Sequence, residues 1–386
     1  ENKRGILGSF KHGQSLDIHG RNDSLVCGSS CVTANESLIT DLIQTFVTSE
    51  DGSTYAFGSA GSIYARTGDI DDGAWNFAFN DENGNITGAA EFQLSDGITY
   101  MYWATASCVA RRAMNTGGKD LPWTNAVQDY KVDKISSSAV WHTMGIASGQ
   151  LNIANAEGLA SITFADAFDP FDLNIRPGNL INAIEERDDN IILGSERSDG
   201  GEEGHIWSWI TTATNWVQKK KLSAQGVNAL ITSELMLAQA GDDGSIYYSD
   251  LVNQIPLHRI PGGGKVNPGG VALLDGLAMF GFYGGTYPGI WSYGRKQKNR
   301  ANALNYEYRL AKTVAGSSVS TIGAVTVSNG DLLVSWGTTD GSTSDYGVDQ
   351  VSSTTRASAI YEGLEFDKGL GFQAKLVDSI ALVMTP

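Results

Sequence analysis

From residue 25 onward, short apolar runs alternate with polar turns that contain glycine, and the apolar positions are spaced as in strands rather than helices. Residues 48–67, which read TSEDGSTYAFGSAGSIYART, show the pattern most clearly. Asp51-Gly52 precedes one apolar run and Gly61-Ser62 precedes the next. An Asp-Gly pair between apolar runs is the strongest local signal for a β-hairpin. The stretch therefore predicts consecutive antiparallel strands joined by tight turns.

The same pattern recurs about every 40 to 50 residues along the chain. Each unit has an apolar strand, a polar turn, a second apolar strand and a Gly-rich turn. A third strand, which often starts with Ile and an aromatic residue, and a less regular outer segment complete the unit. The seven units have their first strands predicted at residues 42–47, 89–94, 141–147, 181–185, 227–231, 270–274 and 322–327.

Repeats of this length with about four strands each are typical of β-propellers, in which every sheet forms one blade of a closed ring. A blade packs both faces against its neighbours, which explains why the inner strands are apolar almost throughout. Closure of the ring leaves only short sheet edges exposed. We therefore predict an all-β fold, a β-propeller with seven four-stranded blades. A pair of β-sandwiches or a long β-solenoid accommodates the irregular spacing better, but accounts less well for the three-strand rhythm.

The units also define the organisation of the chain. We predict three parts: an N-terminal arm at 1–24, the propeller at 25–365 and an exit strand at 366–386. The exit strand is expected to leave the ring as the first strand of a following β-domain. Closing the ring requires its two ends to share one blade. For this we expect residues 25–27 or 16–18 to pair with residues 360–361 or 358–359.

Composition and charge exclude several classes of partner. The 386 residues include 46 glycines and carry a formal net charge of −16. Nucleic-acid binding needs clustered Lys and Arg. We interpret the two basic clusters, at 219–221 and 295–300, as solvated hairpin edges, so we predict no nucleic-acid partner. The chain contains no apolar run of about eighteen residues, so we predict no membrane span.

The cysteines and the acidic loops do not predict a disulfide framework or a metal site. Cys27, Cys31 and Cys108 are an odd, low number without a zinc-ligand spacing, and we interpret them as buried thiols. Residues 69–73 and 81–85 gather several oxygen-bearing side chains, but neither segment has the alternating Asp/Asn frame of a calcium loop. We interpret both as solvated turns.

The sequence shows no catalytic constellation. The five histidines, at positions 12, 19, 142, 205 and 258, have no metal-ligand spacing and no recognisable acid–base partner, so we interpret them as structural. Glu91, Glu185 and Glu234 lie near predicted inner strands, where a propeller glycosidase places two carboxylates across one sugar. Their positions along the chain do not set them opposite one another. We therefore predict no catalytic, cofactor-binding or metal-binding residues.

Aromatic residues on turns supply the alternative of sugar binding at the rim of the ring. Trp75, Trp123, Trp216 and Tyr287 lie in or beside predicted turns, where they are able to stack on sugar rings. Aromatic residues also cap the edges of blades, so the pattern fits a purely structural role as well.

The two ends of the chain resemble a known class of viral proteins. The resemblance is carried by Gly5-Ile6-Leu7, Leu16-Asp17-Ile18-His19, Thr40-Asp41-Leu42-Ile43, residues 51–64 and residues 358–386. Together they are similar to the β-propeller proteins of tailed-phage and environmental viral sequences, in which a strand leaving the ring precedes a β-sandwich. The middle of the chain matches only as generic blades, and no functional residue is transferred.

This resemblance implies a non-enzymatic structural protein of a phage tail or appendage, located on the virion or outside the cell. Its expected partners are other virion proteins and a host-surface glycan or receptor, with homo-oligomers inside the particle. The alternative from a different class is a secreted or cell-surface glycan-binding protein or propeller glycoside hydrolase. No cofactor is expected in either case.

Overall fold

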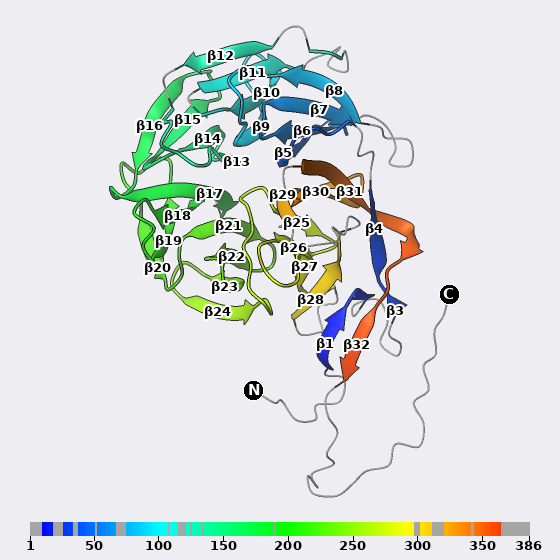
Figure 1. Cartoon of the computed structure of the whole chain (residues 1–386). Helices are drawn as coiled ribbons and strands as arrows, with labels where there is room; N and C mark the ends of the chain where they lie inside the picture. The colour runs from blue at the N-terminus through cyan, green and yellow to red at the C-terminus, as the bar shows by residue number, and fades with distance from the viewer. Residues whose placement is uncertain are drawn as a thin grey trace, which may run out of the picture.

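The computed structural model describes residues 10–17, 26–33, 38–50, 52–66, 75–106, 108–114, 121–123, 126–132, 135–188, 190–296, 302–310, 320–340 and 343–363. Every regular element in these ranges is a β-strand. The strands form seven radial sheets around a central axis (Figure 1). The predicted all-β fold, a β-propeller with seven four-stranded blades, is confirmed.

The blades are numbered along the chain, and the strands of each are given from the axis outward. Blade 1 contains β5 (Ile43–Thr48), β6 (Thr54–Gly58), β7 (Ser62–Arg66) and β8 (Trp75–Asn80). Blade 2 contains β9 (Gly88–Gln93), β10 (Thr99–Ala104), β11 (Cys108–Ala113) and β12 (Val127–Val132). Blade 3 contains β13 (Met144–Ala147), β14 (Gln150–Asn155), β15 (Gly158–Thr163) and β16 (Phe168–Asn174). Blade 4 contains β17 (Asn179–Arg187), β18 (Asn190–Arg197), β19 (Gly204–Trp209) and β20 (Gln218–Leu222).

The remaining three blades complete the ring. Blade 5 contains β21 (Val227–Thr232), β22 (Met236–Ala240), β23 (Ser245–Ser249) and β24 (Gln254–Arg259). Blade 6 contains β25 (Val271–Leu274), β26 (Leu277–Phe282), β27 (Gly289–Gly294) and β28 (Ala303–Tyr308). Blade 7 contains β29 (Ser320–Ser328), β30 (Asp331–Asp340), β31 (Thr343–Arg356) and β4 (Ser29–Thr33).

The turn chemistry explains why the first two strands of each blade form a hairpin. At the turns Ser148-Gly149, Asp275-Gly276 and Asn329-Gly330, both central residues have positive φ, from 50° to 89°. Two consecutive positive φ values define the type I′ turn, whose twist matches that of the flanking strands. All seven of these turns lie on one face of the ring, because the strands within a blade are antiparallel. We call this face, which also carries the turns between third and fourth strands, the hairpin face.

The hydrophobic core is divided among the seven interfaces between blades. Seven clusters of buried side chains each join two neighbouring blades, and the seventh joins blade 7 to blade 1. Adjacent residues of one strand serve opposite interfaces: Tyr102 packs toward blade 3, whereas Trp103 packs toward blade 1. Burying a large apolar side chain stabilises a fold by about 1.5–3 kcal/mol. The middle strands of a blade, such as β6, β7 and β26, are therefore buried along their whole length because both of their faces are core.

The two ends of the ring share blade 7, as expected, but the strand that closes the ring is not among those expected. The outermost strand of blade 7 is β4, which pairs antiparallel with β31 and places Cys31 opposite Val351. The segments 16–17 and 26–27, which we expected to close the ring, instead pair with each other as β2 (Leu16–Asp17) and β3 (Val26–Cys27). A further close contact seals the inner strands, because a Cβ added to Gly323 would lie 1.9 Å from the carbonyl oxygen of Ile43.

Two further strands extend blade 6 outward. β1 (Phe10–Gln14) pairs parallel with β28, and β32 (Ile360–Gly363) pairs antiparallel with β1. Both strands project from the rim of the ring (Figure 1). The predicted N-terminal arm therefore contains one strand of this sheet, β1, whereas the predicted exit strand at 366–386 lies outside the described residues. Within the described ranges, no helix is long and apolar enough to cross a membrane.

Candidate functional site

The inner strands of six blades enclose a chamber on the axis of the ring. The chamber has a volume of about 220 Å³. Its walls come from inner strands or the loops that precede them, and the lining residues are Gln44, Thr45, Phe46, Thr87, Gly88, Ala89, Trp141, Thr143, Met144, Ile184, Glu185, Leu230, Pro268, Gly269 and Val271. This half-open space brings residues from six blades together.

The loop that joins blade 5 to blade 6 covers the chamber at the end opposite the hairpin face. Its residues Pro268 and Gly269 line the chamber, and Gly269 approaches blade 1 so closely that a Cβ there would lie 2.3 Å from the carbonyl oxygen of Gln44. The backbone N–H of Val325 donates to the Gly269 carbonyl at 2.8 Å, and the Asn267 side chain donates to the Ile322 carbonyl at 2.9 Å. The loop is thus fixed to blades 1 and 7.

Glu185 is the charged residue of the chamber wall. It lies near the end of β17, and its carboxylate accepts a hydrogen bond from the backbone N–H of Thr232 in blade 5 at 3.0 Å. Burial raises the pKa of Glu185 to about 7, and the nearby charge of Glu186 acts in the same direction. Because one N–H only partly compensates the lost hydration, the carboxyl group changes charge close to neutral pH.

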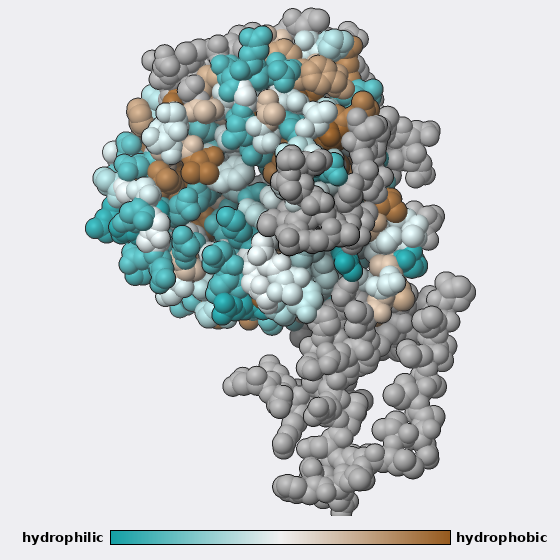
Figure 2. All heavy atoms as spheres, viewed as in Figure 1, coloured by the Kyte–Doolittle hydropathy of each residue, from teal (hydrophilic) through white to brown (hydrophobic). Residues whose placement is uncertain are grey.

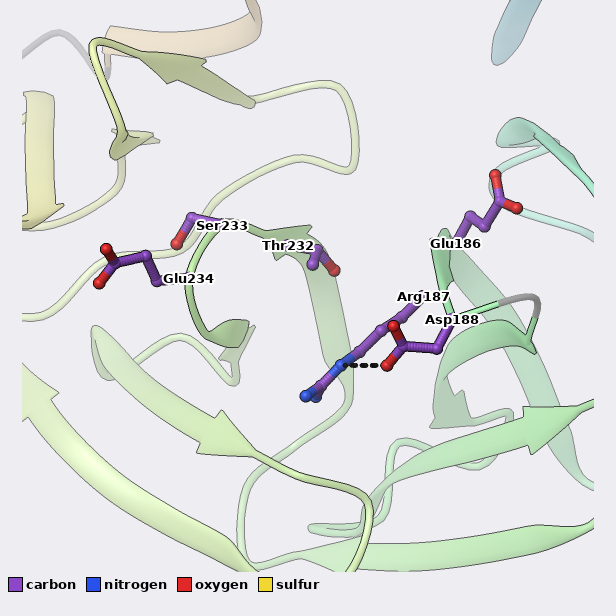
Figure 3. A pocket seen from close by; sticks show the side chains of 6 residues that line it. All are labelled: Glu186, Arg187, Asp188, Thr232, Ser233 and Glu234. Atoms are coloured by element: carbon purple, nitrogen blue, oxygen red, sulfur yellow. Dashed lines mark ion pairs between the residues drawn. The ribbon is translucent and has the colours of Figure 1, made fainter.

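A second, open hollow lies on the hairpin face between blades 4 and 5 (Figure 3). It has a volume of about 530 Å³ and is lined by Glu186, Arg187, Asp188, Thr232, Ser233 and Glu234. Figure 3 shows Arg187 and Asp188 side by side between the two turns, with Glu186 and Glu234 pointing away from them. Arg187 pairs with Asp188 at 3.5 Å and donates to the Ser249 carbonyl at 3.3 Å. The hollow adjoins the chamber through Thr232, whose N–H binds Glu185.

The three carboxylates considered from sequence each bind a structural partner. Glu91 on β9 accepts hydrogen bonds from the Ser49 hydroxyl at 2.5 Å and the Glu50 N–H at 3.0 Å. Glu234 lies in the turn after β21 and forms an exposed ion pair with Arg295 at 2.7 Å. Glu91 and Glu185 therefore belong to inner strands, as expected, and each links its blade to the neighbouring blade.

Two of the described histidines, His142 and His205, are held inside the fold, whereas His258 is exposed. His142 is fully buried between the hydroxyl of Thr87, at 2.8 Å, and the carbonyl of Ser136, at 3.1 Å. Burial lowers its pKa to about 4. His205 is also buried, and burial together with the charge of Lys219 lowers its pKa to about 4. Both rings are neutral at pH 7, which agrees with the structural role expected of them.

The acidic loops and the cysteines also have structural surroundings. Asp81 accepts hydrogen bonds from the Trp103 indole at 2.6 Å and from Asn83 at 2.9 Å, so its carboxylate is occupied within the fold. The other acidic loop, 69–73, lies outside the described residues. No group of three or more potential metal ligands occurs in the described ranges. Cys31 and Cys108 are buried, as expected, whereas Cys27 is only half-buried.

Two of the four aromatic residues considered for sugar stacking are core residues. Trp75 is fully buried, 6.1 Å from the ring of Phe46, and Trp123 is 3 % exposed, beneath the Arg112 guanidinium at 4.6 Å. The sugar-stacking interpretation is wrong for this pair, because neither ring face is open to solvent. Trp216 and Tyr287 are 37 % and 38 % exposed. Only these two remain available to a ligand.

Sequence reasoning missed most of the chamber. Of its lining residues, it singled out Glu185, but only as a possible glycosidase carboxylate, and it predicted no catalytic residue. Gln44, Phe46 and Trp141 fall in or beside predicted first strands, which was the available signal. Their convergence depends on how the blades are staggered around the axis, which the sequence pattern does not specify.

Comparison with known proteins identifies the fold of the chain but assigns the chain to no family. No protein-family model and no curated protein matches the chain. Among solved structures, the WD40 β-propeller domain of Doa1 is similar with 11% identity and a TM-score of 0.54, covering 84% of this chain and 97% of that one. U3-55K gives 12% identity and a TM-score of 0.55, covering 84% and 100%. The extracellular domain of BT4673 from B. thetaiotaomicron gives 14% and 0.57, covering 85% and 40%. The class is thus a seven-bladed β-propeller.

Proposed function

We propose that this propeller is a non-enzymatic interaction platform whose hairpin face binds a macromolecular partner. The observation that carries the proposal is the exposure of large apolar side chains at the outer turns of three successive blades. Phe164 in blade 3 is 54 % exposed, Val217 in blade 4 is 51 % exposed and Val252 in blade 5 is 64 % exposed. Apolar side chains gathered on one surface are typical of sites where proteins interact.

The neighbouring residues support the same face. Ile210 and Trp216, in the turn that also holds Val217, are 38 % and 37 % exposed. Elsewhere, the side of the molecule seen in Figure 2 has small apolar patches separated by hydrophilic side chains. The candidate carboxylates support a role without catalysis, since Glu91 and Glu234 are engaged by neighbouring turns.

The partner we propose follows from the resemblance of the chain ends to viral propellers. In this proposal the chain is part of a virion tail or appendage, its partners are other particle proteins or a host-surface receptor, and copies of the chain assemble within the particle. The charge of −16 supports a partner with a basic surface, because opposite charges accelerate encounter.

Mass spectrometry of purified virus particles, combined with hydrogen–deuterium exchange, tests this proposal. We expect peptides of the chain in the particles, and slower exchange at residues 210–217 and 250–253 in the assembled than in the free protein. The turn at 198–203, on the opposite face, is the internal control and should exchange equally in both. Absence of the chain from particles refutes the viral assignment. Protection confined to 198–203 refutes the assignment of the hairpin face.

Glycan binding is the second candidate, and the exposure of Trp216 favours it. Its indole ring lies 5.2 Å from that of Trp207 in an edge-on arrangement, and Lys219 lies 4.7 Å above the Trp207 ring. A glycan array with the wild type and a Trp216→Ala variant tests this function, and a Tyr287→Ala variant tests the other exposed aromatic residue separately. Binding lost only in Trp216→Ala supports it, and an array without binding removes it. A reducing-sugar assay on the bound glycans decides between binding and hydrolysis.

A further inference from the structure

The central chamber presents a carboxylate that the described chain satisfies only in part. The Glu185 carboxylate accepts a hydrogen bond from the Thr232 backbone N–H, and the Thr232 side chain also helps to stabilise its charge, although a carboxylate has room for about four hydrogen bonds. No Lys, Arg or His lines the described chamber. Buried acceptors without donors are costly, so the chamber favours a ligand that brings donors.

The rest of the wall is suited to an apolar or cationic body. Phe46 and Trp141 contribute aromatic rings, and Met144, Leu230 and Val271 contribute aliphatic side chains. An ammonium group beside an aromatic face gains about 0.5–2 kcal/mol from the electrostatic attraction of the ring. A carboxylate and aromatic rings together repel anions and attract organic cations.

We propose that the chamber binds a small protonated alkylamine. Its ammonium group donates a hydrogen bond to the Glu185 carboxylate, and its alkyl chain packs against Met144, Leu230 and Val271. This inference is independent of the interaction platform proposed above, because the chamber lies on the axis and the platform on the outer turns. The two proposals therefore fail separately.

Proton release provides a signature that a merely apolar cavity lacks. Glu185 is partly protonated near neutral pH because burial raises its pKa to about 7. A bound ammonium stabilises the ionised carboxylate and lowers that pKa. Binding near pH 7 must then release a fraction of a proton to the buffer, which calorimetry in buffers of different ionisation enthalpy measures directly.

Isothermal titration calorimetry with n-hexylammonium chloride, at about pH 8 where both groups are charged, tests the proposal. The matched neutral probe is 1-hexanol, which has the same chain without the charge. We expect the ammonium to bind at least about tenfold more tightly than the alcohol, which corresponds to about 1.4 kcal/mol. Equal affinities for the two probes, or no binding of the ammonium, would overturn the proposal.

Two variants locate the site and one controls for the overall charge. Glu185→Gln keeps an acceptor for the Thr232 N–H but removes the charge, and we expect at least a tenfold loss of ammonium affinity. Phe46→Leu removes an aromatic ring from the chamber wall, and we expect a severalfold loss; it also serves if Glu185→Gln does not fold. Glu202→Gln removes an exposed charge in the turn on the opposite face and should change the affinity less than twofold. A loss in Glu202→Gln equal to that in Glu185→Gln would mean nonspecific attraction to an acidic protein and would refute the site.

Discussion

Replacing Glu185 by Gln should stabilise the propeller at alkaline pH and leave it unchanged at acidic pH. The carboxylate is half-buried in the chamber wall and accepts one hydrogen bond from Thr232 at 3.0 Å. The amide oxygen of Gln accepts the same hydrogen bond without carrying a charge. The substitution therefore isolates the effect of burying the charge from the effect of the link between blades 4 and 5.

The sign and size of the effect follow from the pKa of Glu185. Its value is about 7 in the folded protein, against 4.5 for the free side chain, so the folded state holds the proton more tightly. The stability gained from the protonated group is complete below pH 4.5 and is lost as the pH rises through about 7. The full loss corresponds to about 3 kcal/mol, and partial solvent access reduces it to about 1–3 kcal/mol.

Urea denaturation at about pH 5 and pH 8, followed by tryptophan fluorescence, measures this difference. Wild type and Glu185→Gln should have similar midpoints at the lower pH, and the variant should have the higher midpoint at the upper pH. Glu202→Gln is the matched control, because Glu202 lies exposed in the turn on the opposite face and its charge should change stability by less than about 0.5 kcal/mol at either pH. A wild type that loses no stability relative to Glu185→Gln between the two values would refute the reasoning about burial.

Three further predictions concern the packing of the ring, all measured by urea denaturation. Gly323→Ala places a Cβ 1.9 Å from the carbonyl oxygen of Ile43 and should lower the free energy of unfolding by about 1–3 kcal/mol. Gly276→Asn lies in an open turn at φ 78° and should leave that free energy nearly unchanged. Arg111 is half-buried and joins blades 2 and 3 through an ion pair with Asp166 at 3.0 Å. Arg111→Met should lower the free energy of unfolding by about 1–2 kcal/mol. Arg111→Lys should recover only part of that loss, because lysine lacks a planar group to stack on Tyr130. A chain that begins after β4 leaves blade 7 without its outer strand and should lower the midpoint more than any of these substitutions; an unchanged midpoint would show that β4 does not hold the ring closed.

The inner part of every blade was predictable because its pattern depends on burial alone. A strand with neighbours on both faces is apolar throughout, and turns such as Asn329-Gly330 mark where it reverses. The closing strand was not predictable in the same way. β4 reads Ser-Ser-Cys-Val-Thr, and its position follows from pairing with β31 rather than from an apolar run of its own.

The candidate site was less accessible to sequence reasoning than the fold. Trp75 was assigned to a turn, but it starts β8 and packs into the interface of blades 7 and 1. Gln44 and Glu185 lie in strands of blades on different sides of the axis, and only the closed ring brings them into one chamber. Local pattern determines which residues face inward, whereas the stagger of the blades determines which of them meet.

The pairing of β1 with β32 has a mechanical consequence. Phe10 is the partner of Gly363, and the register then runs inward to Gln14 opposite Ile360. Because the two strands are antiparallel and their outer ends coincide, a pull applied to Phe10 and Gly363 loads the pairs one after another rather than all at once. This part of the molecule should therefore unzip at low force and act as an extensible tether, while the ring behind it stays intact.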